Sequence, residues 1–109
     1  MNIQDLAAKS EHASQLLALL ANAHRLQILC ALQDGERSVS ALEAVIDLSQ
    51  SSLSQHLAKL RAAGIVSTRR EAQSIYYAIA DGRAARVLEV LAELFCKPEK
   101  STRAKRRQG

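Results

Sequence analysis

The clearest hydrophobic pattern in the chain lies between residues 47 and 66. Leu53, Leu57 and Leu60 recur at spacings of four and three residues, which places them on one face of a helix. The opposite face carries hydroxyls, an amide and a cation, with little apolar bulk. Alone, this pattern favours an ordinary surface helix over a helix that reads a DNA major groove, because amphipathic helices are common.

The same periodicity predicts four further helices. They span about residues 4–20, 23–33, 39–46 and 83–96. The helix at 23–33 is apolar nearly all round, so we expect it to be buried. Side chains that suit a helix N-cap precede three of the helices, namely Asn22, Ser38 and Ser49. Ser40 with Glu43 forms an alternative capping box, which leaves the start of the third helix open.

A β-hairpin is predicted directly after the polar-faced helix. Gly64 suits the left-handed residue that ends the helix. Residues 65–70 and 75–79 favour strands, residues 71–74 form the loop between them, and Ile75, Tyr77 and Ile79 alternate as residues facing a core do. Asp81-Gly82 closes the hairpin.

These elements predict a mainly helical (α+β) fold, a winged helix-turn-helix. The order is helix, helix, helix, helix, strand, strand, helix, within one domain of residues 1–96. A polar-faced helix that follows a short helix and a tight turn, and precedes a hairpin, is typical of this fold. The two terminal helices carry more apolar surface than a small domain needs for itself, which predicts a homodimer built from them.

The polar-faced helix between residues 47 and 66, called the reading helix below, and the hairpin after it supply the candidate DNA contacts. Residues suited to base edges are Gln50, Ser52, Ser54, Gln55 and His56. Residues suited to phosphates are Ser51, Lys59, Arg61, Arg69 and Arg70. The two arginines stand on the hairpin, where they suit a phosphate or minor-groove contact of a wing or, alternatively, a solvated charge pair.

Composition and charge narrow the class of protein. The 109 residues suit one domain, aromatic residues make up only 3%, and no apolar run reaches the length of a membrane span. No secretory signal is visible, so we expect a cytoplasmic protein. Residues 97–109 hold six Lys or Arg and one Glu, a charge of +5, which leaves −1 of the net +4 for residues 1–96. This basic tail is predicted to be disordered, and is either solvated or an additional phosphate contact.

The chain resembles the ArsR/SmtB family of small dimeric winged-helix repressors. The resemblance covers about residues 5–96 and rests on LLALLANAHRLQILCAL (16–32), on the block from Ser38 to Asp81 with its LSQSSLSQHLAKLR, basic wing and Ile-Tyr-Tyr, and on the last helix. Ala23 departs from the family, since many members have Pro there. The resemblance implies a homodimer on near-palindromic operator DNA, released by an inducer.

Many members of this family respond to metals, but the metal motifs are incomplete here. Ser38-Val39-Ser40 stands where one family site has Cys-x-Cys, and Asp81 matches a second site whose His partners are missing after His56. Since a tight transition-metal site needs several Cys or His ligands, we expect no metal and no cofactor.

Cys30 and Cys96 are the two cysteines of the chain. By themselves they suit small buried hydrophobes. Residues ILCALQDGERSV and the later LFC, however, resemble the BigR-like, persulfide-responsive branch of the family. This resemblance implies that Cys30 and Cys96 are the sensing thiols, bridged within one subunit when reactive sulfur species act as inducer. The order of attack stays open.

Several alternatives remain beside this sulfur-responsive repressor. They are a metal-responsive repressor, a repressor that responds to general thiol oxidation, and a winged helix that binds proteins, which the −1 charge of residues 1–96 favours. An enzyme is the least favoured class, because the sequence contains no C-x-x-C motif.

Overall fold

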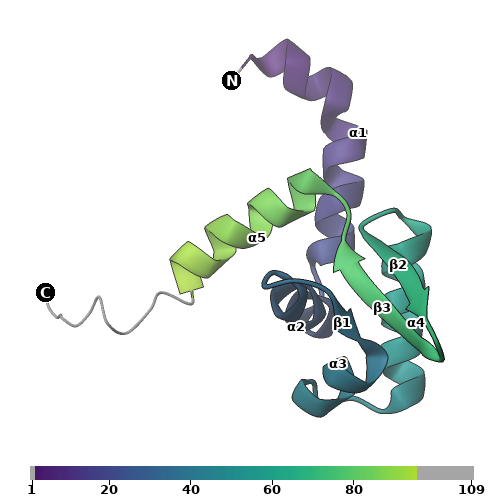
Figure 1. Cartoon of the computed structure of the whole chain (residues 1–109). Helices are drawn as coiled ribbons and strands as arrows, with labels where there is room; N and C mark the ends of the chain where they lie inside the picture. Colours follow the sequence, from purple (N-terminus) through teal and green to yellow (C-terminus); the bar gives the residue numbers. More distant parts are fainter. Residues whose placement is uncertain (1, 96–109) are drawn as a thin grey trace, which may run out of the picture.

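The computed structural model describes residues 2–95 (Figure 1). Its elements are α1 (Ile3–Leu20), α2 (Ala23–Leu32), β1 (Arg37–Ser38), α3 (Val39–Val45), α4 (Gln50–Ala62), β2 (Val66–Glu71), β3 (Ser74–Ile79) and α5 (Gly82–Phe95). The predicted winged helix-turn-helix is confirmed, with α3 and α4 as its two helices and β2 and β3 as its wing. The basic tail, 97–109, lies outside the described residues.

Polar side chains begin the helices where the sequence predicts it. The side chain of Asn22 accepts the N–H of Arg25 at 3.0 Å, and Ser38 accepts the N–H of Ala41 at 3.1 Å. Ser38, rather than the Ser40 capping box, therefore begins α3. Each cap satisfies an N–H of the first turn that has no partner within the helix.

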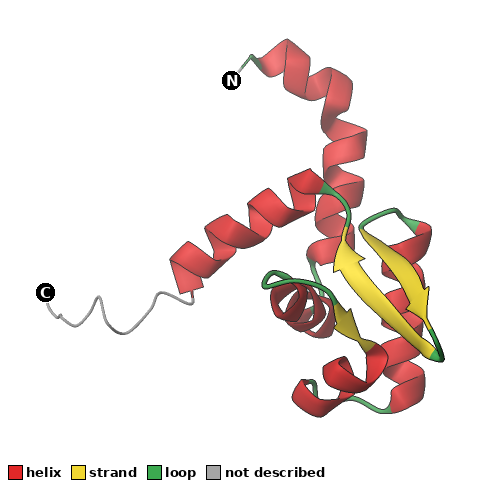
Figure 2. Ribbon diagram, viewed as in Figure 1, coloured by secondary structure: helices red, strands yellow, loops and turns green. Residues whose placement is uncertain are grey.

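The sheet has three antiparallel strands in the order β1-β3-β2, one more than the sequence predicts (Figure 2). The additional strand, β1, is only two residues long, which is too short for an alternating pattern. The four-residue loop predicted at 71–74 is wrong, because Glu71 pairs with Ser74 across a two-residue turn. Ala72 has a φ of 57° there, as two-residue hairpin turns require.

One aliphatic core joins the helices to the sheet. Its buried members are Leu20, Ile28, Leu29, Leu32, Leu42, Ile46, Leu53, Leu57, Leu60, Ile65, Val66, Ala84 and Leu88, with Tyr77 and Ile79 packed against them. The prediction that α2 is buried all round is wrong. Ala23, Gln27 and Cys30 follow one another at helical spacing and form a solvent-exposed stripe along it.

The two terminal helices project from this core (Figure 1). The side chains of Ile3 and Leu17 on α1 are 77% and 55% exposed, and those of Leu94 and Phe95 on α5 are 67% and 79% exposed. The single chain thus leaves much apolar helical surface uncovered. Among residues 2–95, no single helix is long and apolar enough to cross a membrane; α1 and α2 pass that test only as a pair bent by 90°.

Candidate nucleic-acid interface and thiol site

Helix α4 rests on the core and turns its polar face to solvent. Leu53, Leu57 and Leu60 are at most 1% exposed, so the helix is fixed along its whole length. Ser49 begins it by accepting the N–H of Ser52 at 3.1 Å. Most of the predicted DNA contacts are solvent-exposed: Gln50, Ser51, Ser54, Gln55, Lys59 and Arg61 on α4, and Arg69 and Arg70 on the wing.

Helical periodicity orders the residues across this face. Ser51, Gln55, Ala58 and Ala62 lie opposite the buried leucines, since they recur at spacings of four, three and four residues. The alanines keep the outermost ridge of the helix low, so another surface can approach it closely. Gln55 is the longest side chain on this ridge and carries both a donor and acceptors.

Ser52 and His56 are half-buried at the edge of this face. The imidazole of His56 lies 6.0 Å from that of His24, centroid to centroid, where α4 meets the start of α2. Burial lowers the pKa of His56, and the positive charges of Arg25, His24 and Lys59 lower it further. His56 therefore contributes little positive charge above pH 7.

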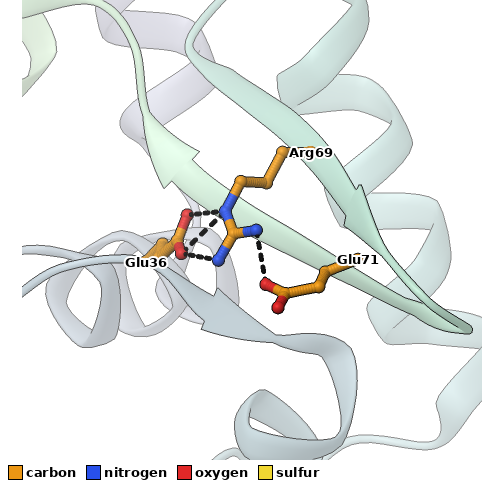
Figure 3. Close-up of polar contacts among 3 residues, drawn as sticks. All are labelled: Glu36, Arg69 and Glu71. Carbon is orange, nitrogen blue, oxygen red and sulfur yellow. Dashed lines mark hydrogen bonds and ion pairs between the residues drawn. The ribbon is translucent and has the colours of Figure 1, made fainter.

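Arg69 is held by two carboxylates on the outer face of the sheet (Figure 3). Its Nε donates to both carboxylate oxygens of Glu36 at 2.9 Å, and its Nη1 donates to Glu71 Oε1 at 2.7 Å. The guanidinium also lies over the Tyr76 ring, 4.7 Å from its centroid. The hydrogen bonds from Arg69 lower the pKa of Glu36, and those to the carboxylates raise the pKa of Arg69.

Arg70, the other predicted wing contact, differs from its neighbour. It is solvent-exposed and forms no ion pair with another residue of the described range 2–95. The two arginines are adjacent in the sequence and both are exposed, but Arg69 is paired with two carboxylates and Arg70 forms no ion pair within residues 2–95. Sequence reasoning treated them alike, because Glu36 lies 33 residues from Arg69 and no local pattern links the two.

A buried arginine at the junction of α1 and α2 was also missed. Arg25 is 8% exposed, and its guanidinium donates to the carbonyl oxygens of Leu19 at 2.5 Å and Ala18 at 3.2 Å. These carbonyls end α1 and have no partner within the helix, so the cation both satisfies them and complements the helix dipole. Arg25 thereby fixes the sharp bend between the two helices.

Asp81 begins α5 rather than merely closing the hairpin. Its Oδ1 accepts the N–H of Arg83 at 2.8 Å, and its carboxylate pairs with the Arg83 guanidinium at 2.9 Å. These contacts lower the pKa of Asp81. Within residues 2–95, no three His, Cys, Asp or Glu side chains gather as metal ligands would.

Cys30 lies on the wall of an apolar groove between α2, the end of α3 and α5. The groove encloses about 620 Å³ and is lined by Leu26, Gln27, Cys30, Ala31, Val45, Ile46, Asp47, Leu88, Leu91, Ala92 and Phe95. Among residues 2–95, Asp47 is the one ionisable side chain in the lining apart from the thiol. The other predicted sensing thiol, Cys96, lies outside the described residues; Phe95, which precedes it in the sequence, lines the groove.

A fixed helix with an exposed polar face, preceded by a short helix and followed by a basic hairpin, defines a winged helix-turn-helix DNA-binding protein. Residues 22–68 match the model of the arsR family of bacterial regulatory proteins. The chain is 46% identical to the transcriptional activator HlyU of Vibrio cholerae over 89% of this chain and 90% of that protein. It is 51% identical to the biofilm growth-associated repressor of Agrobacterium fabrum over 79% and 74%.

Solved structures agree with these sequence matches. Reduced HlyU from Vibrio cholerae has a TM-score of 0.82 at 45% identity, with 87% of this chain and all of that chain covered. The repressor BigR from Xylella fastidiosa has a TM-score of 0.84 at 37% identity, covering 90% and 100%. The chain therefore belongs to the ArsR family of transcriptional regulators, as the sequence resemblance indicates.

Proposed function

We propose that this protein is a homodimeric repressor that binds near-palindromic operator DNA and leaves it when Cys30 and Cys96 react with reactive sulfur species. The observation that carries DNA binding is the exposed ridge of α4, fixed to the core by three buried leucines beside a basic wing. The relatives described as biofilm growth-associated repressors support repression, whereas HlyU is described as an activator.

We propose Gln55 as the main residue that contacts a base edge. It lies in the middle of the exposed ridge, and a glutamine amide can pair with both N6 and N7 of adenine. Gln50, Ser52, Ser54 and His56 flank it as further candidates, while Ser51, Lys59, Arg61 and Arg70 suit phosphate oxygens.

Two copies of the chain place two such helices on one duplex. The exposed apolar side chains of α1 and α5, including Leu17, Leu94 and Phe95, suit an interface that buries them against a second copy. A related ArsR-type domain from Mycobacterium bovis, 32% identical with a TM-score of 0.71, is described as homodimeric. Sedimentation as a monomer at micromolar concentration contradicts this proposal.

The groove beside Cys30 supports the sensing role. Cys30 is solvent-exposed on α2, and Phe95 of the opposite wall immediately precedes Cys96 in the sequence. One thiolate attacks a polysulfide donor, R–S–Sₙ–S–R, and forms a new S–S bond while one R–S⁻ leaves. The second thiolate then displaces the other R–S⁻, so a sulfur bridge joins the two cysteines and the donor departs as two thiols.

Such a bridge links α2 to the end of α5, and α2 shares its core with the reading helix. Ile28 and Leu29 of α2 pack in the same buried cluster as Leu57 of α4. A shift of α2 therefore changes how the reading helices of a dimer are spaced. A coupling of about 1–3 kcal/mol corresponds to binding weaker by about 5- to 150-fold.

The test measures affinity for a duplex that the reduced protein selects from a random pool, before and after polysulfide treatment. We expect polysulfide to weaken DNA binding by the wild type and to leave binding by Cys30→Ser or Cys96→Ser unchanged. Before treatment, both variants should bind DNA with the affinity of the reduced wild type. An unchanged wild type, or a full response in Cys30→Ser, refutes the sensing role. If the reduced wild type shows no salt-dependent binding to any duplex, DNA binding itself is refuted.

Mass spectrometry then separates a sulfur sensor from a general redox switch. The protein is exposed separately to polysulfide, to hydrogen peroxide and to an organic disulfide. With polysulfide alone, we expect the peptide pair that contains Cys30 and Cys96 to gain whole sulfur atoms and to lose the two thiol hydrogens. Loss of two hydrogens without added sulfur, with all three reagents, assigns the site to general thiol oxidation instead.

A further inference from the structure

Arg69 spans the outer face of the whole sheet. It starts on β2 and ends on Glu36, next to β1 (Figure 3). On the way its guanidinium passes over the ring of Tyr76, its cross-strand partner on β3. Glu71, two residues further along β2, holds the same guanidinium from the side. We name Glu36, Arg69 and Glu71 the wing clamp.

We propose that Arg69 is a positioning residue that fixes the wing to the end of α2, and that Glu36, although acidic, is therefore needed for full DNA affinity. This inference rests on the DNA-binding function proposed above. It reassigns Arg69, which the sequence predicts to be a phosphate contact.

Charge argues against a phosphate contact by Arg69. The clamp holds one cation and two carboxylates, so its sum is −1, and a phosphate that approaches it meets net repulsion. Arg69 would also have to give up a bidentate pair with Glu36, the geometry in which an arginine–carboxylate pair is strongest. Arg70 forms no such pair within residues 2–95 and is the better phosphate ligand.

The far end of the clamp is tied to α2. Glu36 follows the turn at Gly35, whose φ is 135°, and the next residue, Arg37, donates from Nε to the carbonyl oxygen of Ala31 at 2.7 Å. Ala31 lies in the last turn of α2, one residue after Cys30. The clamp therefore connects the helix that carries the thiol to the wing by side chains, in addition to the pairing of β1 with β3.

Isolated surface ion pairs contribute little, but this one has features that set it apart. Arg69 binds Glu36 at two points, binds a second carboxylate, and has an aromatic ring under its guanidinium. The pair also joins two separate segments of the chain, because Glu36 precedes β1 and Arg69 lies on β2. Exposed ion pairs contribute measurably to stability when they have such geometry and form a network.

The decisive variant is Glu36→Gln, because the two roles of Arg69 predict opposite signs. Removing a negative charge near DNA strengthens binding if Glu36 only competes with phosphate for Arg69. If the clamp positions the wing, binding instead weakens by about 5-fold, the lower end of typical coupling between sites. The matched control is Glu71→Gln, which removes the same charge from the same arginine but breaks only one hydrogen bond, and we expect a smaller loss.

Salt dependence gives a second, independent readout. A phosphate contact contributes about 0.9 to the slope of log affinity against log salt concentration. We expect Arg70→Gln to lower the slope by about this amount per subunit, and Arg69→Gln to weaken binding with the slope unchanged. A lowered slope in Arg69→Gln, or tighter binding in Glu36→Gln, overturns the inference.

Hydrogen exchange tests the clamp without DNA, so its result stands even if the DNA-binding function fails. Loss of the clamp in Glu36→Gln is expected to speed exchange of the β2 and β3 backbone amides, with the α4 amides unchanged. Equal exchange of the wing in Glu36→Gln and wild type overturns the inference whatever the affinity shows. Wild-type protein that fails to bind any duplex, with faster wing exchange in the variant, instead overturns the proposed function alone.

Discussion

The reading face of α4 and the groove at Cys30 are built on opposite principles. The reading face comes from one continuous segment, is polar, and rests on buried leucines of that same segment. The groove is apolar and is assembled from α2, the end of α3 and α5, with Val45 and Phe95 of its lining 62% and 79% exposed. A rigid surface suits recognition, whereas walls contributed by separate helices can change their spacing when a bond forms between them.

The largest effect expected from this comparison is on folding stability. Leu57→Ala removes a side chain that is 1% exposed under the reading face, and large-to-small changes in cores cost about 2–5 kcal/mol. Val45→Ala in the groove lining is the control, with an expected change within about 0.5 kcal/mol, because the side chain is largely in solvent. Urea unfolding at one fixed protein concentration measures both. Equal losses contradict the contrast between the two regions.

The next effect concerns sequence preference. Gln55→Ala removes the longest side chain of the exposed ridge without touching the core. If Gln55 reads a base, the variant loses about 1–3 kcal/mol of discrimination at one position of each half-site and keeps its affinity for other sequences. Binding to a set of duplexes with single base changes measures this. A uniform loss on all duplexes instead assigns Gln55 to the backbone.

The difference between a face made by one segment and a groove made by several also explains which features could be predicted from the sequence. The leucine stripe of α4, its Ser49 cap and its Gly64 end are local patterns, and all three are confirmed, with a φ of 78° at Gly64. Helical periodicity and capping depend on residues a few positions apart, so they are visible in one segment.

Features made by distant segments could not be predicted in the same way. The pair between Glu36 and Arg69, the groove around Cys30 and the short strand β1 each depend on how separate elements pack. The exposed stripe of α2 was missed for a related reason, since Cys30 and Ala23 count as apolar in a sequence pattern whichever way they face. The role of Cys96 and the DNA contacts remain predictions.

A smaller effect is expected at the start of the reading helix. Ser49→Ala leaves the first-turn N–H of Ser52 without its side-chain acceptor, and the loss of such a cap costs about 1 kcal/mol. Ser49→Asp restores an acceptor and places a negative charge at the helix N-terminus, so it should recover the stability. It also repels phosphate, so its DNA affinity should stay below that of the wild type. Thermal unfolding with parallel binding measurements separates these two effects.

The smallest effect is expected at His56, where the reading helix meets the helix that carries Cys30. Burial, together with the positive charges of Arg25, His24 and Lys59, holds its pKa below the ordinary 6.5 in the folded protein. The unfolded chain therefore binds more protons just below pH 6.5, so stability is highest above that pH and falls on acidification until the folded pKa is passed. His56→Gln removes this titration and should flatten the curve of unfolding free energy against pH below 6.5, while the salt dependence of DNA binding at pH 8 stays unchanged. A lower salt dependence in the variant at pH 8 shows instead that His56 carries a charge to the DNA.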